Sequence, residues 1–320
     1  MKKRLLSALL ALCMMLTMMP TVAFAAEGEQ SQPVPLAEGD VAQIGNDTYP
    51  TLKDAIDASE NGDTITLLGN CKLPTTNFPS GKTLVIDGTS SSYTIDADTA
   101  YLNIAGDVTF QNCELNMHGV PSGNWMYIYM ASNGILTFDN ADVTIDGTDA
   151  DDNTAAMYFP EPNTPCADVN IKNSTVEIKN CRGNGISWGG STNNGNNQFN
   201  IDSSTVTIDN CAEKNTSGGG GIVGTFDITL TDSDLTVKNN KGYGSNGSHF
   251  IIKDSTVDFS DNGSHGLSAG ELSIDHSTVT ANNNKGMGIT VNENFTVKDN
   301  SNVEVTGNAS NSSYGYAAVR

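Results

Sequence analysis

Apolar and polar residues alternate with period two in a short unit that returns along most of the chain. One copy reads Ile171-Lys-Asn-Ser-Thr-Val176-Glu-Ile178, and the next reads Ile201-Asp-Ser-Ser-Thr-Val206-Thr-Ile208. Alternation of period two predicts strands, and a fixed unit with variable insertions predicts a solenoid. Successive anchors lie 22 to 33 residues apart, at Leu115, Val143, Val176, Val206, Leu235, Val257, Val279 and Val303.

A coil of about 22 residues leaves room for three short strands and three bends, but not for a helix. The leucine-rich frame is absent, and a β-propeller would need repeats of about 40 residues. We therefore predict an all-β chain, a right-handed parallel β-helix over residues 41–320. Its coils begin at about residue 69, and equivalent strands stack about 4.8 Å apart.

Residues 41–68 are predicted to cap the N-terminal end of the solenoid. Leu52, Ala55 and Ile56 recur at helical spacing, Thr51 is suited to be the N-cap, and Asn61-Gly62 is expected to end the helix. At the other end, residues 314–320 resemble the start of another inward-facing strand. We expect either a longer, truncated protein or a partner that covers this end.

The first residues have the pattern of a secretory signal peptide. Lys2, Lys3 and Arg4 precede an apolar run of about 15 residues, and Ala23-Phe24-Ala25 gives a small-x-small cleavage site. We predict a signal peptide over residues 1–25 and a flexible linker over residues 26–40. The apolar run is shorter than a membrane span, so the mature chain is expected to be secreted or on the cell surface without membrane insertion.

Charge narrows the choice of partners. The formal net charge is −21, from 37 acidic and 16 basic residues. Nucleic acid is therefore excluded as a partner, because its phosphates require a basic surface.

The opening segment Ile44-Gly-Asn-Asp-Thr-Tyr-Pro-Thr-Leu-Lys-Asp-Ala-Ile56 leads into Gly62-Asp-Thr-Ile-Thr-Leu67. Together with the repeat, it resembles the pectate-lyase-like superfamily of right-handed β-helices, and β-helix domains of secreted or surface proteins of Gram-positive bacteria. That superfamily contains lyases, hydrolases, epimerases and non-catalytic adhesins, so the resemblance implies a fold and not an activity.

The catalytic patterns of that superfamily are largely missing. Asp151-Asp152 and Ser264-His265-Gly266 each match only part of the hydrolase motifs. Ser273-Ile274-Asp275-His276 resembles a pectate-lyase segment in which Trp is replaced by Ser. The lyase arginine has no evident counterpart. We assign no catalytic residue and favour a protein that is not an enzyme.

Aromatic residues suggest a binding surface. Trp125, Tyr127 and Tyr129 alternate with Met126, Ile128 and Met130, so the aromatic set should face outward if the second set faces the core. Tyr158 and Trp188 fall in the corresponding strands of the next two coils. An outward aromatic strip suits the stacking of sugar rings; the alternative is that long insertions bury it.

Other candidate chemistry is weaker. Asp149, Asp151 and Asp152 lie in one acidic loop that either binds calcium or is merely solvated. Cys181 and Cys211 occupy the same place in successive coils and form either a disulfide or, as we prefer, a buried thiol pair. The histidines are scattered and are interpreted as ordinary turn residues: His118, His249, His265 and His276.

The favoured interpretation is an extracellular, non-catalytic β-helix module for surface adhesion or carbohydrate binding, with a glycan or a host or matrix surface as partner. The alternative is a polysaccharide lyase or glycoside hydrolase that acts on an acidic polysaccharide. No cofactor beyond calcium is indicated.

Overall fold

The computed structural model describes residues 39–89, 92–121, 123–151, 153–160, 166–189, 197–214 and 219–309. The predicted signal peptide, all but the end of the predicted linker, and residues 310–320 lie outside the described residues. The described residues all belong to one compact unit. Within the described part, no helix is long and apolar enough to cross a membrane.

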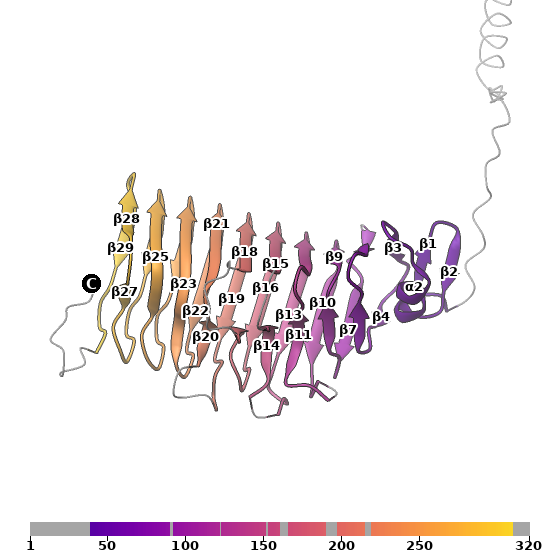
Figure 1. Ribbon diagram of the computed structural model, residues 1–320, viewed down its shortest axis with the longest axis horizontal. Helices are drawn as coiled ribbons and strands as arrows, with labels where there is room; N and C mark the ends of the chain where they lie inside the picture. Colours follow the sequence, from indigo (N-terminus) through magenta and orange to yellow (C-terminus); the bar gives the residue numbers. More distant parts are fainter. Residues whose placement is uncertain are drawn as a thin grey trace, which may run out of the picture. The chain divides into compact units, whose positions relative to one another are not determined.

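The described part is a parallel β-solenoid whose coils each contribute a strand to three faces (Figure 1). Face 1 consists of β5 (Thr76–Phe78), β8 (Leu102–Ile104), β11 (Met126–Met130), β14 (Ala155–Phe159), β17 (Ile186–Trp188), β20 (Gly220–Val223), the first parts of β23 (Tyr243–Lys253) and β25 (Leu267–Asp275), and β27 (Ile289–Val291).

Face 2 follows face 1 along each coil. It consists of β3 (Thr64–Leu67), β6 (Thr83–Asp87), β9 (Asp107–Gln111), β12 (Ile135–Asp139), β15 (Asp168–Lys172), β18 (Asn197–Asp202), β21 (Phe226–Thr231), the later parts of β23 and β25, and β28 (Phe295–Lys298).

Face 3 is a separate ten-stranded sheet. It consists of β4 (Cys71–Lys72), β7 (Thr94–Asp98), β10 (Glu114–His118), β13 (Asp142–Asp146), β16 (Thr175–Lys179), β19 (Thr205–Asp209), β22 (Asp234–Lys238), β24 (Thr256–Asp258), β26 (Thr278–Thr280) and β29 (Asn302–Glu304). The predicted anchor column is confirmed residue by residue, because every anchor from Leu115 to Val303 lies in register with the next.

The N-terminal cap contains the predicted helix, α2 (Leu52–Ala58). The Thr51 side chain accepts a hydrogen bond from the Asp54 backbone N–H, as the N-cap prediction requires. The helix ends at Ala58, earlier than predicted. The sequence did not indicate the antiparallel hairpin β1 (Ala42–Ile44) and β2 (Asp47–Tyr49), whose first strand pairs with β3 and covers the edge of face 2.

The bend between faces 2 and 3 is a column of left-handed residues. Each has φ between 49° and 56°, a region that Asn and Asp tolerate better than other side chains. The polar residue at this position of each repeat is therefore explained by the left-handed backbone that the bend requires. Its members are Asn112, Asn140, Asn173, Ser203, Asp232, Asp254, His276 and Asn300.

Next to this column, buried serine side chains connect each coil to the next through hydrogen bonds. The Ser233 hydroxyl donates to the Thr231 carbonyl (2.6 Å) and accepts from the Ser204 backbone N–H (3.1 Å). The same pattern repeats at Ser174, Ser204, Ser255 and Ser277. Each hydroxyl therefore satisfies a buried amide of the preceding coil, which would otherwise be unpaired.

A second column of hydrogen bonds lies at the bend after face 3 and contains Asn240, Asn262 and Asn284. The backbone N–H and the side-chain amide of each asparagine both donate to the side-chain oxygen of the asparagine in the next coil. Cys181 and Cys211 occupy the equivalent places upstream, and the Cys211 N–H donates to Asn240 Oδ1 (2.9 Å). Neither cysteine forms a disulfide and both are fully buried, which confirms the preferred prediction of a buried thiol pair. Hydrogen bonding to Cys211 and burial raise the pKa of Cys181.

We predict that Ser233→Ala lowers the free energy of unfolding by about 1–3 kcal/mol, because it leaves the buried Ser204 N–H without an acceptor. Urea unfolding followed by circular dichroism measures the change. Thr236→Ala, on the outward side of β22, is the control and should cost about 0.5 kcal/mol or less. Equal effects of the two substitutions would contradict the role of the ladder.

Candidate functional site

Four aromatic side chains form a continuous row on face 1, here called the aromatic strip: Tyr101, Trp125, Tyr129 and Tyr158. Tyr129 lies in register with Tyr158, and their ring centroids are 6.2 Å apart. Tyr101 is 6.3 Å from Tyr129, and Trp125 is 4.4 Å from Tyr158. Three of the five predicted aromatic residues therefore lie together, and Tyr101, which the sequence analysis missed, extends the row.

The strip remains accessible within the described structure. The Trp125 side chain is 47% exposed, and the three tyrosines are partly exposed. Burial and the neighbouring Tyr129 raise the pKa of Tyr101, which agrees with the close approach of the two side chains. Aromatic rings with one face packed and one face open are suited to apolar contact with a ligand.

A glycine makes room for Tyr158. A Cβ atom at Gly189 would lie 2.1 Å from the Tyr158 hydroxyl oxygen, so no larger residue fits there without displacing the ring. The position of Tyr158 in the strip thus depends on a small residue in the next coil.

The prediction for Tyr127 was wrong, because this side chain is fully buried. β11 begins where the chain leaves a bend, and Met126 and Tyr127 are both buried there, so alternation starts only at Ile128. The equivalent positions in the next two coils hold the small residues Ala156 and Gly185. Burial, followed by the nearby Cys181 thiol and Asp146 carboxylate, raises the pKa of Tyr127.

The prediction for Trp188 was also wrong. Trp188 lies in register with Phe159, which is buried, and packs partly against the core. The outward position of β17, in register with Tyr158, belongs to Ser187. The Trp188 indole N–H is buried without a hydrogen-bond partner in the described structure. The aromatic strip therefore ends at Tyr158.

The acidic loop has a structural role at its first residue. Asp146 Oδ1 accepts from the Thr148 backbone N–H (3.0 Å) and from Asn180 (3.1 Å). Burial raises the pKa of Asp146, but these hydrogen bonds outweigh burial and hold the pKa below its usual value. Asp149 and Asp151 are exposed, and Asp152 lies outside the described residues. Among the described residues, no three acidic, His or Cys side chains lie close enough to hold a metal ion.

His276, in the segment that resembles pectate lyases, is one of the left-handed bend residues, as the sequence interpretation had it. Its Nδ1 lies 3.1 Å from Asp254 Oδ1, another residue of the same column. His265 stacks on Tyr243 with ring centroids 5.2 Å apart, and burial lowers its pKa. The histidines of these two partial matches therefore each contact a side chain of a neighbouring coil.

No protein-family model and no curated protein matches the sequence. Among solved structures, the chain is similar to the PL6 family alginate lyase AlyGC, with 14% identity, a TM-score of 0.38, and coverage of 75% of this chain and 39% of that one. It is also similar to the catalytic domain of a GH87 α-1,3-glucanase in complex with tetrasaccharides, with 12% identity, a TM-score of 0.26, and coverage of 80% and 62%.

The chain thus spans less than two thirds of each of these proteins. Both TM-scores are below 0.5, so these similarities carry no conclusion about activity, and the β-solenoid assignment rests on the strand pairing of this chain.

We predict that Tyr127→Phe lowers the free energy of unfolding by about 1 kcal/mol and leaves ligand binding unchanged. The Tyr127 hydroxyl donates to the Gly119 carbonyl (2.7 Å) and lies 3.2 Å from the Asp146 carbonyl, so its loss leaves a partly buried acceptor unpaired. Thermal unfolding compares this variant with Tyr129→Phe, which should be neutral. A neutral Tyr127→Phe would show that these hydrogen bonds are unimportant.

Proposed function

We propose that this protein is an extracellular, non-catalytic β-helix module that binds a glycan through the aromatic strip. The observation that carries the proposal is the row of ring contacts from Tyr101 to Trp125 on the outer surface of face 1. Pyranose rings present apolar C–H faces, which pack on exposed aromatic rings. Exposed apolar patches on soluble proteins usually bind a partner.

The fold itself does not require aromatic residues at these positions. The outward column that holds Tyr129 and Tyr158 holds Asn103 one coil earlier and Ser187 one coil later. Farther along, the same column holds Val223, Asn246 and Ser268. Stacking of the coils therefore does not require aromatic residues in this column, and the aromatic side chains are a local addition that a binding role explains.

The strip is better suited to neutral sugars than to acidic ones. The chain has a net charge of −21, and uronate groups would be repelled by such a surface. A linear neutral glycan that lies across the strands would contact successive rings, since the row runs from coil to coil. Adhesion to a glycan-bearing surface would follow from the same contacts.

We expect Trp125→Ala and Tyr129→Ala each to weaken glycan binding about tenfold or more, which corresponds to about 1.4 kcal/mol, because aromatic anchors dominate such interfaces. Affinity electrophoresis against neutral polysaccharides identifies the ligand, and calorimetry measures the loss. Phe295→Ala removes an exposed aromatic side chain far from the strip and serves as the control. Undiminished binding by the strip variants would refute the proposal.

The rival proposal, a lyase or hydrolase that acts on an acidic polysaccharide, is tested by incubating the folded protein with acidic and neutral polysaccharides, with and without calcium. New reducing ends or unsaturated products would establish an enzyme. We expect none.

A further inference from the structure

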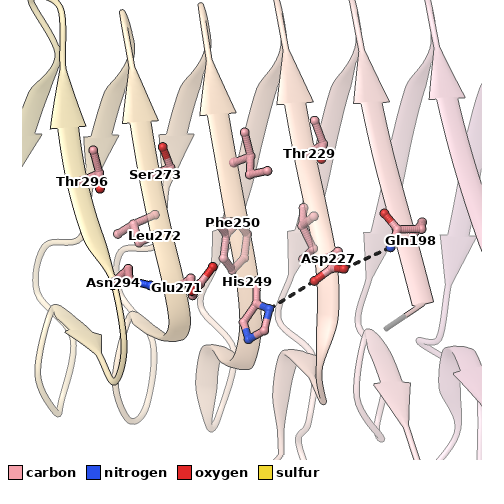
Figure 2. A pocket seen from close by; sticks show the side chains of 12 residues that line it. Gln198, Asp227, Thr229, His249, Phe250, Glu271, Leu272, Ser273, Asn294 and Thr296 are labelled. Atoms are coloured by element: carbon pink, nitrogen blue, oxygen red, sulfur yellow. Dashed lines mark hydrogen bonds and ion pairs between the residues drawn. The ribbon is translucent and has the colours of Figure 1, made fainter. Parts of the chain in front are cut away.

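A shallow trough of about 530 Å³ lies on face 2, between β18 and β28 (Figure 2). It is separate from the aromatic strip, which lies on face 1 between β8 and β14. The trough runs across the strands, so that each coil contributes outward side chains to it. Two rows of side chains line it, one polar and charged, the other composed of hydroxyl groups and one aliphatic residue.

The polar row is held together by hydrogen bonds. Gln198 donates to one Asp227 oxygen (3.1 Å), and His249 Nδ1 lies 3.2 Å from the other. Because a carboxylate can only accept, Nδ1 carries the proton. Asn294 donates to Glu271 Oε1 (2.7 Å), which fixes the second carboxylate beside the imidazole.

The backbone is shaped to place His249 in this row. The register between β23 and β25 shifts between Asn246 and Phe250, and Gly247 has φ +100°. Such bulges redirect a side chain and are over-represented beside functional sites. Gly270 completes the arrangement, because a Cβ atom there would lie 2.4 Å from both Cδ2 and Nε2 of the imidazole. His249 is therefore a strand residue in a fitted position, and its interpretation as a turn residue was wrong.

The second row contains Thr229, Ile251, Ser273 and Thr296 in register. Ile251 is 57% exposed, an unusual position for an isoleucine at the centre of a polar surface. It offers an apolar contact between hydroxyl groups. This mixture of hydroxyl, amide and small apolar surface suits a ligand with many hydroxyl groups.

Charge defines the ligand further. Asp227 and Glu271 are two coils apart, so their backbones are separated by about 9.6 Å. No lysine or arginine belongs to the described residues that line the trough. Two carboxylates in a groove of an acidic protein attract a cation and repel an anion.

We propose that the trough is a second binding site, specific for oligosaccharides that carry free amino groups. One ammonium group pairs with Asp227 and another with Glu271, on either side of the His249 imidazole, and the sugar hydroxyls bond to the amide and hydroxyl side chains. A basic peptide is disfavoured, because the trough crosses the strands and offers no free strand edge for main-chain pairing. The site is independent of the aromatic strip.

The test is calorimetric titration of the Trp125→Ala variant, in which the aromatic strip is disabled, with glucosamine trisaccharide, its fully N-acetylated counterpart, and trilysine. We expect only the glucosamine trisaccharide to bind measurably, and its affinity to fall as salt increases. Glu271→Gln and Gly270→Ala should each weaken binding at least tenfold. Gly270→Ala changes no charge and acts only by displacing the imidazole, so it separates a built site from a general electrostatic attraction.

Asp275→Asn is the matched control, since it removes a carboxylate from the same strand, β25, outside the trough. Added to the Trp125→Ala variant, it should leave the affinity for the glucosamine trisaccharide within about twofold. Circular dichroism verifies that each variant is folded. Equal binding of the acetylated trisaccharide or of trilysine, or an unchanged affinity in Glu271→Gln or Gly270→Ala, would overturn the inference.

Discussion

The structure depends on satisfying buried backbone amides from one coil to the next. At each bend, some backbone N–H groups are buried and can form a hydrogen bond neither with water nor with a neighbouring strand. The Ser204 N–H finds its acceptor in Ser233, and the Asn240 N–H finds one in Asn262. A shift of register by one residue would break these bonds and turn the core side chains outward. The ladders therefore fix the stacking register together with the apolar columns.

Because the inner positions fix the register, the outer positions are free to vary. Asn103, Tyr129, Tyr158 and Ser187 occupy one column with the same backbone pairing and different chemistry. Side chains at successive coils lie about 4.8 Å apart, which places functional groups at a regular spacing on a rigid surface. A parallel β-helix can thus gain a binding surface by substitution on one face without altering its core, and two faces can carry different surfaces.

The repeat in the sequence predicted the stacking of the strands correctly, but it did not predict the side-chain orientations at bends and bulges. The anchor column from Leu115 to Val303 was correct because its period-two pattern is unbroken. Tyr127 was placed wrongly because alternation does not extend through the bend before β11, and Trp188 because it lies one residue past the outward position of β17. His249 was missed because β23 and β25 run continuously from face 1 into face 2, and nothing in the sequence marks the bulge that redirects the imidazole. Neither the bulge nor the space that Gly270 provides for the imidazole changes the periodic pattern of the sequence.

Charge separates the two proposed sites from each other and from enzymes that act on acidic polysaccharides. A β-elimination at a uronate requires a cation to neutralise the substrate carboxylate. The described residues that line the trough offer two carboxylates instead, and Arg182 is paired with Glu213 (3.8 Å) elsewhere. The aromatic strip contributes apolar faces without charge, whereas the trough contributes acceptors for ammonium groups. The same acidic chain would therefore bind a neutral glycan by stacking on one face and an amino sugar by charge on the next.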